Sequence, residues 1–204
     1  MTSSTIQSLD TLRALYAGPG ERASKKQLGA LDRHARRFIE LSPFVVLASS
    51  GAAGAIDASP RGGAPGFVKT PDAHTLLLPD APGNNRLDSL SNIVESGRVG
   101  LLFMIPGFDE TLRVNGSALL STDAADIAHC TDERRAPKLV IRVGVQEVYL
   151  HCAKAFMRSR LWRAESHVPR SAMPTIGQMI ADQTGIQVPV ETQEEMARRY
   201  APDL

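Results

Sequence analysis

The stretch ETLRVNGSALL (residues 110–120) alternates apolar and polar side chains with the period of a β-strand. Leu112, Val114 and Leu120 fall on one face of such a strand, whereas Arg113 falls on the other. This alternation predicts a strand with one buried face, and it predicts that Arg113 points away from that face.

Short apolar runs on both sides of this stretch predict further strands, most of them joined by Gly, Pro or Asp turns. The expected strands cover residues 44–48, 55–59, 66–69, 75–78, 99–105 and 139–150. The first two are typical of a hairpin, because a glycine-bearing turn separates them. In the last one the apolar phase changes near Glu147, which predicts a β-bulge. About six strands are enough for a small barrel.

Helical patterns precede and interrupt the predicted strands. Ser24 and Gln27 have the spacing of a capping box and predict a helix over 25–41, and a shorter helix is expected over 9–15. Asn85 is a candidate N-cap for a helix between the strands.

Two helices are expected after the last strand. One covers 176–183, stopped by Gly185, and the other covers 193–200, opened by a capping box of Thr192 and Glu195.

The whole chain is expected to form one domain, residues 1–204. Within it, 1–42 would form N-terminal helices, 43–152 the barrel and 153–204 C-terminal helices. A length of 204 residues is sufficient to bury a substantial core.

The charge balance and the cysteines limit the possible partners and compartment. The 23 Lys and Arg against 22 Asp and Glu leave a net charge of +1, which argues against a nucleic-acid or anionic-membrane partner. The sequence has neither an apolar run long enough to span a bilayer nor an N-terminal export signal. Cys130 and Cys152 lack the C-x-x-C spacing of a zinc site. A cytoplasmic protein with reduced thiols is expected.

Two segments could hold an anion. Asn84, Asn85 and Arg86 come at a predicted helix start, where free backbone N–H groups and a guanidinium favour a phosphate. The alternative is an ordinary capped junction with Arg86 in solvent. The glycine-rich turn 59–63 carries Arg61, which could bind phosphate or ring oxygens, or could lie in a solvated hairpin turn.

A third candidate surface follows the last strand. Lys154 and Trp162 would share one helical face that could border a flat aromatic cofactor, although Trp162 could equally pack in a core or a dimer interface. His151 beside Cys152 raises the alternative of a thiol nucleophile, but adjacent strand residues face opposite sides and a packing cysteine is favoured. The sequence lacks the motifs G-x-G-x-x-G, G-x-x-x-x-G-K-[ST], H-E-x-x-H and G-x-S-x-G.

Taken together, several segments resemble the pyridoxamine 5'-phosphate oxidase-like flavoproteins in content and in order over residues 40–162, and more narrowly a subgroup of FMN-dependent enzymes. The segments are SPRGG (59–63), PGNNR (82–86), RVGLLF (98–103), ETLRVNG (110–116) and HCAKA (151–155).

The resemblance implies a mainly β fold with flanking helices: a Greek-key-like, six-stranded split β-barrel that forms a homodimer and binds FMN in a cleft between subunits. The positions that it implies for cofactor binding are Ser59, Arg61, Asn84, Asn85, Arg86, Thr111, Arg113, Lys154 and Trp162. No metal ligand and no catalytic side chain is implied.

The chain departs from true pyridoxamine phosphate oxidases at two places. Their phosphate turn reads Ser-Arg-Lys where this chain has Asn84-Asn85-Arg86, so one positive charge must come from elsewhere, with Arg61 and Arg113 as candidates. Their C-terminal Arg-x-His has no counterpart in residues 197–204. Oxidation of a B6 vitamer is therefore not expected.

The leading functional hypothesis is an FMN-dependent oxidoreductase acting on a small-molecule substrate, with NAD(P)H as a candidate electron donor. A second hypothesis is a flavin-binding storage or sensing protein without turnover. A third keeps the barrel but places haem or a deazaflavin in it, with His151 as a potential iron ligand.

Overall fold

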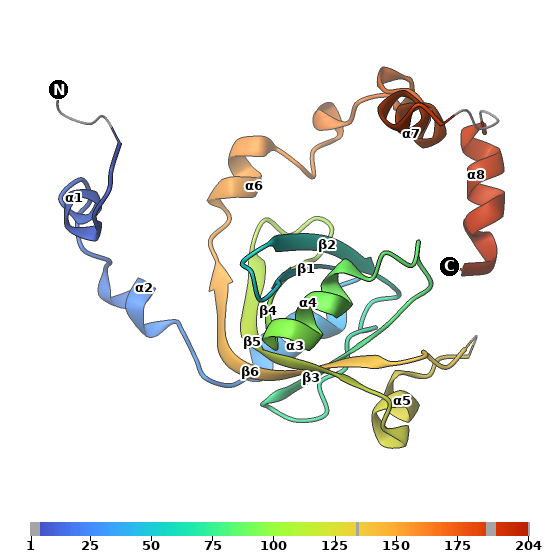
Figure 1. Cartoon of the computed structure of the whole chain (residues 1–204). Helices are drawn as coiled ribbons and strands as arrows, with labels where there is room; N and C mark the ends of the chain where they lie inside the picture. Colours follow the sequence, from blue (N-terminus) through green and yellow to red (C-terminus); the bar gives the residue numbers. More distant parts are fainter. Residues whose placement is uncertain (1–4, 134, 187–190, 204) are drawn as a thin grey trace.

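The structure, a computed structural model, describes residues 5–133, 135–186 and 191–203. Its centre is one six-stranded antiparallel sheet that curls into a split barrel, with helices on its flanks (Figure 1). The strands are β1 (Phe44–Ser50), β2 (Ile56–Gly62), β3 (Thr75–Pro79), β4 (Arg98–Met104), β5 (Thr111–Ser121) and β6 (Val140–His151). The predicted fold class is confirmed.

The strand order is β2-β1-β4-β5-β6-β3, so β2 and β3 lie at the two ends of the sheet. The chain forms a β1–β2 hairpin and a β4–β5–β6 meander, and β3 pairs with β6. Since the sheet curls, the split of the barrel lies between the edge strands β2 and β3. The expected strand over 66–69 is reduced to one isolated bridge between Lys69 and Leu77.

The predicted bulge lies in β6 at Gln146, where the pairing with β5 shifts between Asn115 and Gly116. Gly116 is required there, because a Cβ would lie 2.1 Å from the carbonyl oxygen of Gly144. This close approach lets the two longest strands of the barrel bend together.

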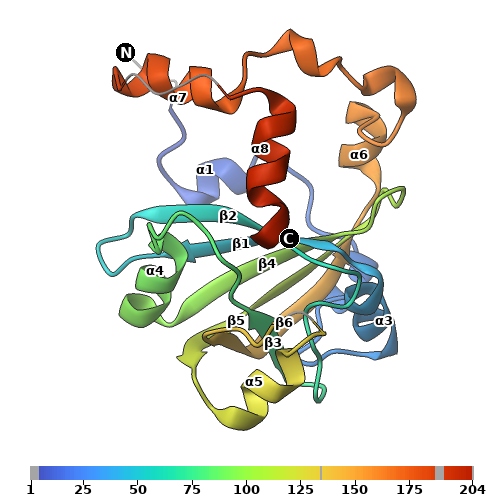
Figure 2. The same ribbon diagram turned by 90° about the vertical axis from the view of Figure 1, so that its right-hand side faces the viewer.

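Eight α-helices are described outside the sheet, and several 3₁₀ turns accompany them. They are α1 (Leu9–Arg13), α2 (Glu21–Lys25), α3 (Arg33–Leu41), α4 (Asp88–Ser96), α5 (Ala124–Cys130), α6 (Lys154–Ser159), α7 (Ile176–Thr184) and α8 (Gln193–Tyr200). α1 and α2 extend from one side of the barrel, and α6 to α8 form an arm that arches above it (Figures 1 and 2).

The predicted helix over 25–41 is wrong in its first half. α3 begins at Arg33 because the carboxylate of Asp32 accepts a hydrogen bond from the Ala35 amide at 2.8 Å. Before it, Leu28 exchanges backbone hydrogen bonds with Val148 of β6. The tertiary pairing therefore takes this segment away from the helical conformation that its local pattern favours.

The two predicted C-terminal helices are confirmed. α7 ends at Gly185, whose φ of 71° provides the left-handed cap, and α8 begins with the capping box of Thr192 and Glu195. α5 was not expected; the carboxylate of Asp123 caps it by accepting from the amide of Ala125 at 2.8 Å.

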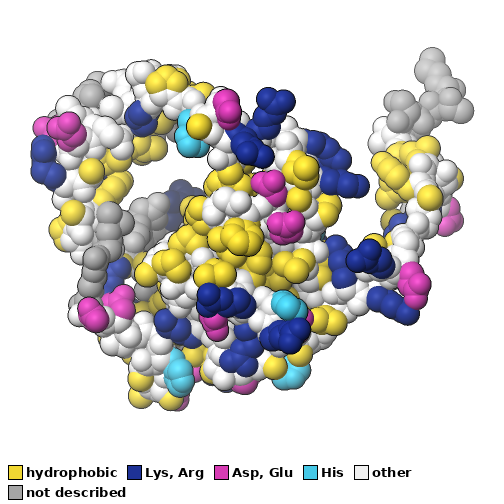
Figure 3. Space-filling view, turned by 180° about the vertical axis from the view of Figure 1, so that it is seen from behind, with side chains coloured by type: hydrophobic (Ala, Val, Ile, Leu, Met, Phe, Trp, Pro, Cys, Tyr) yellow, Lys and Arg dark blue, Asp and Glu magenta, His cyan; other side chains and the backbone are white. Residues whose placement is uncertain are grey.

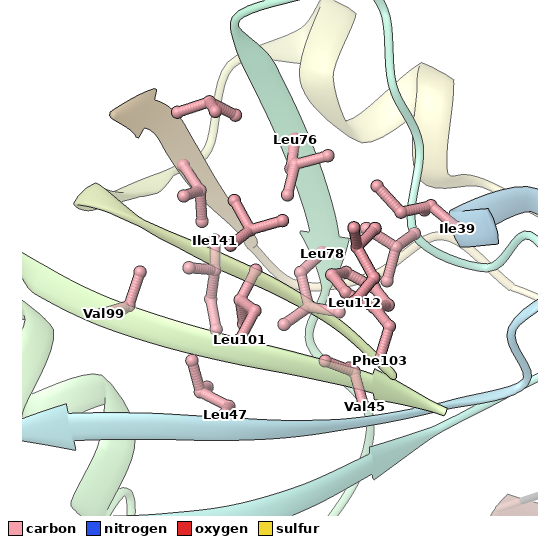
Figure 4. Packing of buried hydrophobic residues seen from close by; sticks show 14 of the residues in the cluster. Ile39, Val45, Leu47, Leu76, Leu78, Val99, Leu101, Phe103, Leu112 and Ile141 are labelled. Carbon is pink, nitrogen blue, oxygen red and sulfur yellow. The ribbon is translucent and has the colours of Figure 1, made fainter. Parts of the chain in front are cut away.

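The core fills the inside of the curled sheet and is closed by α3 and α4. Leu47, Leu76, Leu101, Phe103 and Ile141 are almost completely buried and point toward one another from four strands, β1, β3, β4 and β6 (Figure 4). Truncating one of them to alanine would cost about 2–5 kcal/mol, because such a core cannot collapse around the cavity.

Candidate functional site

The inner face of β2 is polar, unlike the inner faces of the other strands. Val45 and Leu47 of β1 are completely buried in the core, and their partners in register on β2 are Arg61 and Ser59. Residues paired across antiparallel strands share a face, so Arg61 and Ser59 face the inside of the barrel. Asp57, two residues earlier, lies on the same face.

An edge strand with polar residues at three consecutive inward-facing positions buries less apolar surface, and it therefore gains less hydrophobic stabilisation. A bound polar ligand would explain this arrangement, since the polar groups are only half-buried and lie at the split.

Asp57 connects this strand to α4. Its carboxylate accepts hydrogen bonds from the hydroxyl of Ser59 at 3.0 Å and from that of Ser89, in the first turn of α4, at 2.5 Å. Ser89 is buried. The three residues fix α4 over the inner face of β2, beside the split.

The segment between β3 and α4 crosses the split as an exposed loop. Asn84 Oδ1 accepts from the amide of Arg86 at 3.1 Å, and Asn85 and Leu87 have φ of 59°. The predicted N-cap at Asn85 is wrong: α4 begins at Asp88, and its N-cap is Leu87. The N-cap position is thus taken by Leu87, which has a left-handed backbone and an apolar side chain that cannot accept a hydrogen bond.

The first turn of α4 is consequently not capped by any side chain of the described residues. Its free N–H groups and the positive end of the helix dipole face the loop that carries Arg86. Arg86 is largely exposed, and its Nε donates to Asp88 Oδ2 at 2.9 Å. This ion pair raises the pKa of Arg86, which remains fully protonated.

Arg61 lies near Asp80 at the end of β3, on the other side of the split. Burial raises the pKa of the Asp80 carboxyl, and the positive charges of Arg61 and Lys138 oppose that rise. The split thus has Asp57 and Arg61 of β2 on one side and Asp80, directly after β3, on the other.

The structure brings together five of the nine predicted positions, namely Ser59, Arg61, Asn84, Asn85 and Arg86, around the split. The other four lie elsewhere. Arg113 is on the opposite face of the sheet, where it donates to Glu147 at 3.0 Å and stacks 4.4 Å from the ring centroid of Tyr149. Its Nε is buried and has no hydrogen-bond partner among the described residues.

Thr111, Lys154 and Trp162 lie near the end of β6. Thr111 is buried and pairs with His151. The indole N–H of Trp162 donates to the carbonyl of Phe108 at 2.7 Å, and its ring stacks on that of Phe156. Trp162 therefore fastens the start of the C-terminal arm to the β4–β5 hairpin. Lys154 is exposed at the first position of α6.

Two residues of the split, Asp57 and Ser89, were not predicted as site residues from the sequence. Asp57 could have been found from the period-two spacing that it shares with Ser59 and Arg61. Ser89 gave no such signal, because a small residue on a helix is ordinary until its partner on another element is known.

The described part of the chain contains no cluster of His, Cys, Asp and Glu that could hold a metal ion. Both cysteines are free; burial raises the pKa of Cys130 to about 11, whereas the Lys154 amide lowers the pKa of the exposed Cys152. Across the described ranges, no helix has the length and apolar character needed to cross a bilayer.

The family described as pyridoxamine 5'-phosphate oxidase matches residues 31–152, which is more than half of the chain and includes all six strands. The chain belongs to the pyridoxamine 5'-phosphate oxidase family. The match also covers every residue of the split, from Asp57 to Ser89.

Solved structures similar to this family member are distant in sequence. One is a putative pyridoxamine 5'-phosphate oxidase from Lactobacillus delbrueckii, with 19% identity over 61% of this chain and 98% of the other and a TM-score of 0.48. HupZ from Group A Streptococcus has 16% identity over 58% and 91%, with a TM-score of 0.48. An FMN-binding protein from Syntrophomonas wolfei has 10% identity over 58% and 84%, with a TM-score of 0.44. No curated protein matches the chain.

Proposed function

We propose that this chain is an FMN-binding oxidoreductase that holds the flavin phosphate at the split between β2 and β3. The observation that carries the proposal is the polar inner face of β2 opposite the uncapped N-terminus of α4. A helix N-terminus with a neighbouring guanidinium is a favourable seat for a phosphate.

The residues present fit a phosphate group. Arg61 and Arg86 supply two charge-assisted donors, the backbone of Asn84 and Asn85 lies beside them, and the hydroxyl of Ser59 faces the same space. The Arg86–Asp88 pair is exposed, and exposed pairs contribute only about 0–1 kcal/mol. Turning Arg86 from Asp88 toward a dianion therefore costs little.

The four predicted residues that lie away from the split would contact a flavin if a second copy of the chain contributes them. Arg113 lies on the face of the sheet opposite the split, and Thr111, Lys154 and Trp162 lie near the end of β6. We therefore propose a homodimer in which these four residues border the partner's cofactor. Figure 3 shows apolar side chains gathered on the rear face of the barrel, and an exposed apolar patch is typical of an interaction surface.

FMN, when bound, supplies the hydride or electron transfer chemistry. The residues of the chain bind it, orient it and set the local charge. Asp57 holds the hydroxyls of Ser59 and Ser89 in fixed directions, which pre-organises the inner face. We propose a small organic substrate with NAD(P)H as electron donor, and, since both cysteines are free, a cytoplasmic location.

A binding experiment followed by a turnover experiment tests this proposal. Titration of the purified chain into FMN should quench flavin fluorescence in a saturable manner, and the complex should consume NAD(P)H in the presence of simple electron acceptors. FMN binding without NAD(P)H consumption would favour the alternative of a flavin storage or sensing protein. Failure to bind FMN would contradict the proposed function, and haem or a deazaflavin would then be the ligands to test.

A further inference from the structure

A cavity lies on the outer face of the barrel, the face that carries Arg113 and Tyr149, away from the split. It has a volume of about 270 Å³ and is lined by Ala23, Lys26, Gln27, Tyr149 and His151. The first three belong to the N-terminal segment around α2, and the other two belong to the end of β6. The volume is close to the lower end of the range of small-molecule sites.

Backbone pairing fixes this cavity in place. Leu28 donates to the carbonyl of Val148 at 2.9 Å and accepts from its amide at 2.8 Å, so the segment before α3 runs along β6. Lys26 Nζ also donates to the carbonyl of Leu150 at 2.8 Å. Two backbone hydrogen bonds therefore hold the segment along β6, and a third holds the ammonium group beside the last residues of the strand.

The walls of the cavity carry hydrogen-bond donors and no carboxylate. Lys26 has two N–H donors besides the one given to Leu150, and Gln27, Tyr149 and His151 each offer a further donor. The Lys26 ammonium lies 4.9 Å from the centroid of the Tyr149 ring, and the guanidinium of Arg113 also stacks on this ring.

The surrounding charge is positive. The nearest carboxylate on the strand is Glu147, and it already pairs with Arg113. Glu21 of α2 pairs with Lys25 instead of Lys26. Burial and the charges of Arg113 and Lys26 lower the pKa of His151, so the ring is neutral near pH 7 and one of its nitrogens can donate while the other accepts.

We infer that this outer-face cavity binds a small oxyanion, that is, the carboxylate or phosphate group of a small molecule. The ammonium of Lys26 supplies the charge, while Gln27, Tyr149 and His151 supply directional donors around it. This site is distinct from the phosphate site proposed at the split, because the sheet lies between them.

The test is an NMR titration of the full-length chain with inorganic phosphate and, separately, with acetate at constant ionic strength. Saturable shifts at residues 23–27, Tyr149 and His151 with either anion are the expected result, and the anion that binds more tightly identifies the preferred group. The absence of saturable shifts at these residues with both anions would overturn the inference.

Two variants and a matched control sharpen the result. Lys26→Gln should weaken binding about tenfold or more, since it removes a charge-assisted hydrogen bond. Tyr149→Phe keeps the ring beneath the two cations and should weaken it a few-fold. Lys25→Gln removes the same charge from the neighbouring residue and should leave the affinity unchanged. An equal loss of affinity in this control would show that only the net charge matters, and it would contradict a specific site at Lys26.

The same spectra separate this inference from the proposed function. Shifts at residues 84–90 report on the split, where phosphate is also expected to bind. If FMN does not bind but the outer-face cavity saturates, the flavin assignment fails and the oxyanion site stands.

Discussion

Ser89 on α4 donates a hydrogen bond from its hydroxyl to Asp57 on β2, at 2.5 Å. Ser89 is buried, and its acceptor is a carboxylate. This contact ties the helix that borders the split to the edge strand that forms its floor, so it sets the distance between the uncapped N-terminus of α4 and the inner face of β2.

Replacing Ser89 by alanine should lower the free energy of unfolding by about 1.5–3 kcal/mol, the range for a hydrogen bond to a charged group. Urea denaturation followed by circular dichroism measures it. Ser91→Ala, at an exposed position of the same helix, is the control and should change stability by no more than about 0.5 kcal/mol. Equal effects of the two variants would show that the Asp57 contact contributes nothing.

Arg86→Ala should weaken FMN binding by about 1.5–3 kcal/mol, because it removes a charge-assisted contact to the proposed phosphate. Flavin fluorescence quenching gives the dissociation constants. Arg37→Ala is a suitable control, since Arg37 is also an exposed arginine paired with a neighbouring carboxylate, that of Glu40. An unchanged affinity for Arg86→Ala would place the phosphate elsewhere.

Asp80→Asn should stabilise the protein at neutral pH. Burial raises the pKa of this carboxyl above its usual 3.8, so the folded chain disfavours the ionised form relative to the unfolded chain. The cost is present above the raised pKa and disappears as the pH falls toward 3.8. The gain from the substitution should therefore shrink in acid, which denaturation between pH 7 and pH 4 would measure.

Asp72→Asn should behave in the opposite sense. The amide of His74 donates to Asp72 at 2.7 Å and lowers the pKa of its carboxyl below 3.8. Its stabilising contribution is complete above 3.8 and is lost as the pH falls through the lowered pKa. The substitution should thus destabilise the protein at neutral pH, and the same sign for both aspartates would contradict this account.

The oligomeric state tests the role assigned to the outer face. Sedimentation analysis should give twice the mass of one chain, because in the proposed homodimer Arg113 and Trp162 border the flavin across the subunit interface. A monomer that still binds FMN tightly would mean that the split alone holds the cofactor.

Six of the seven expected strands are present, because their period-two patterns, as in residues 110–120, or short apolar runs, as in β3, are bounded by turn residues. The helix starts were less predictable. The segment before Arg33 has a helical pattern, yet Leu28 pairs with Val148, which is more than 100 residues away in the chain. A local pattern contains no information on such a partner.

The division of the candidate site into two faces was only partly visible in the sequence. Alternation in β5 correctly placed Arg113 away from the core. The same reasoning applied to β2 would have placed Arg61 and Ser59 inside, but the turn residues at 60–63 suggested a loop. That α4 begins at Asp88 depends on the left-handed backbone at Asn85 and Leu87, for which the sequence gave no glycine signal.

The decisive experiment for FMN binding at the split is an absorption spectrum of the purified chain after it has been mixed with excess FMN and desalted. Mass analysis then identifies the ligand that is released on denaturation. The account predicts retained flavin bands and release of FMN. A colourless protein, or a Soret band from haem, would contradict the assignment of the split as an FMN site.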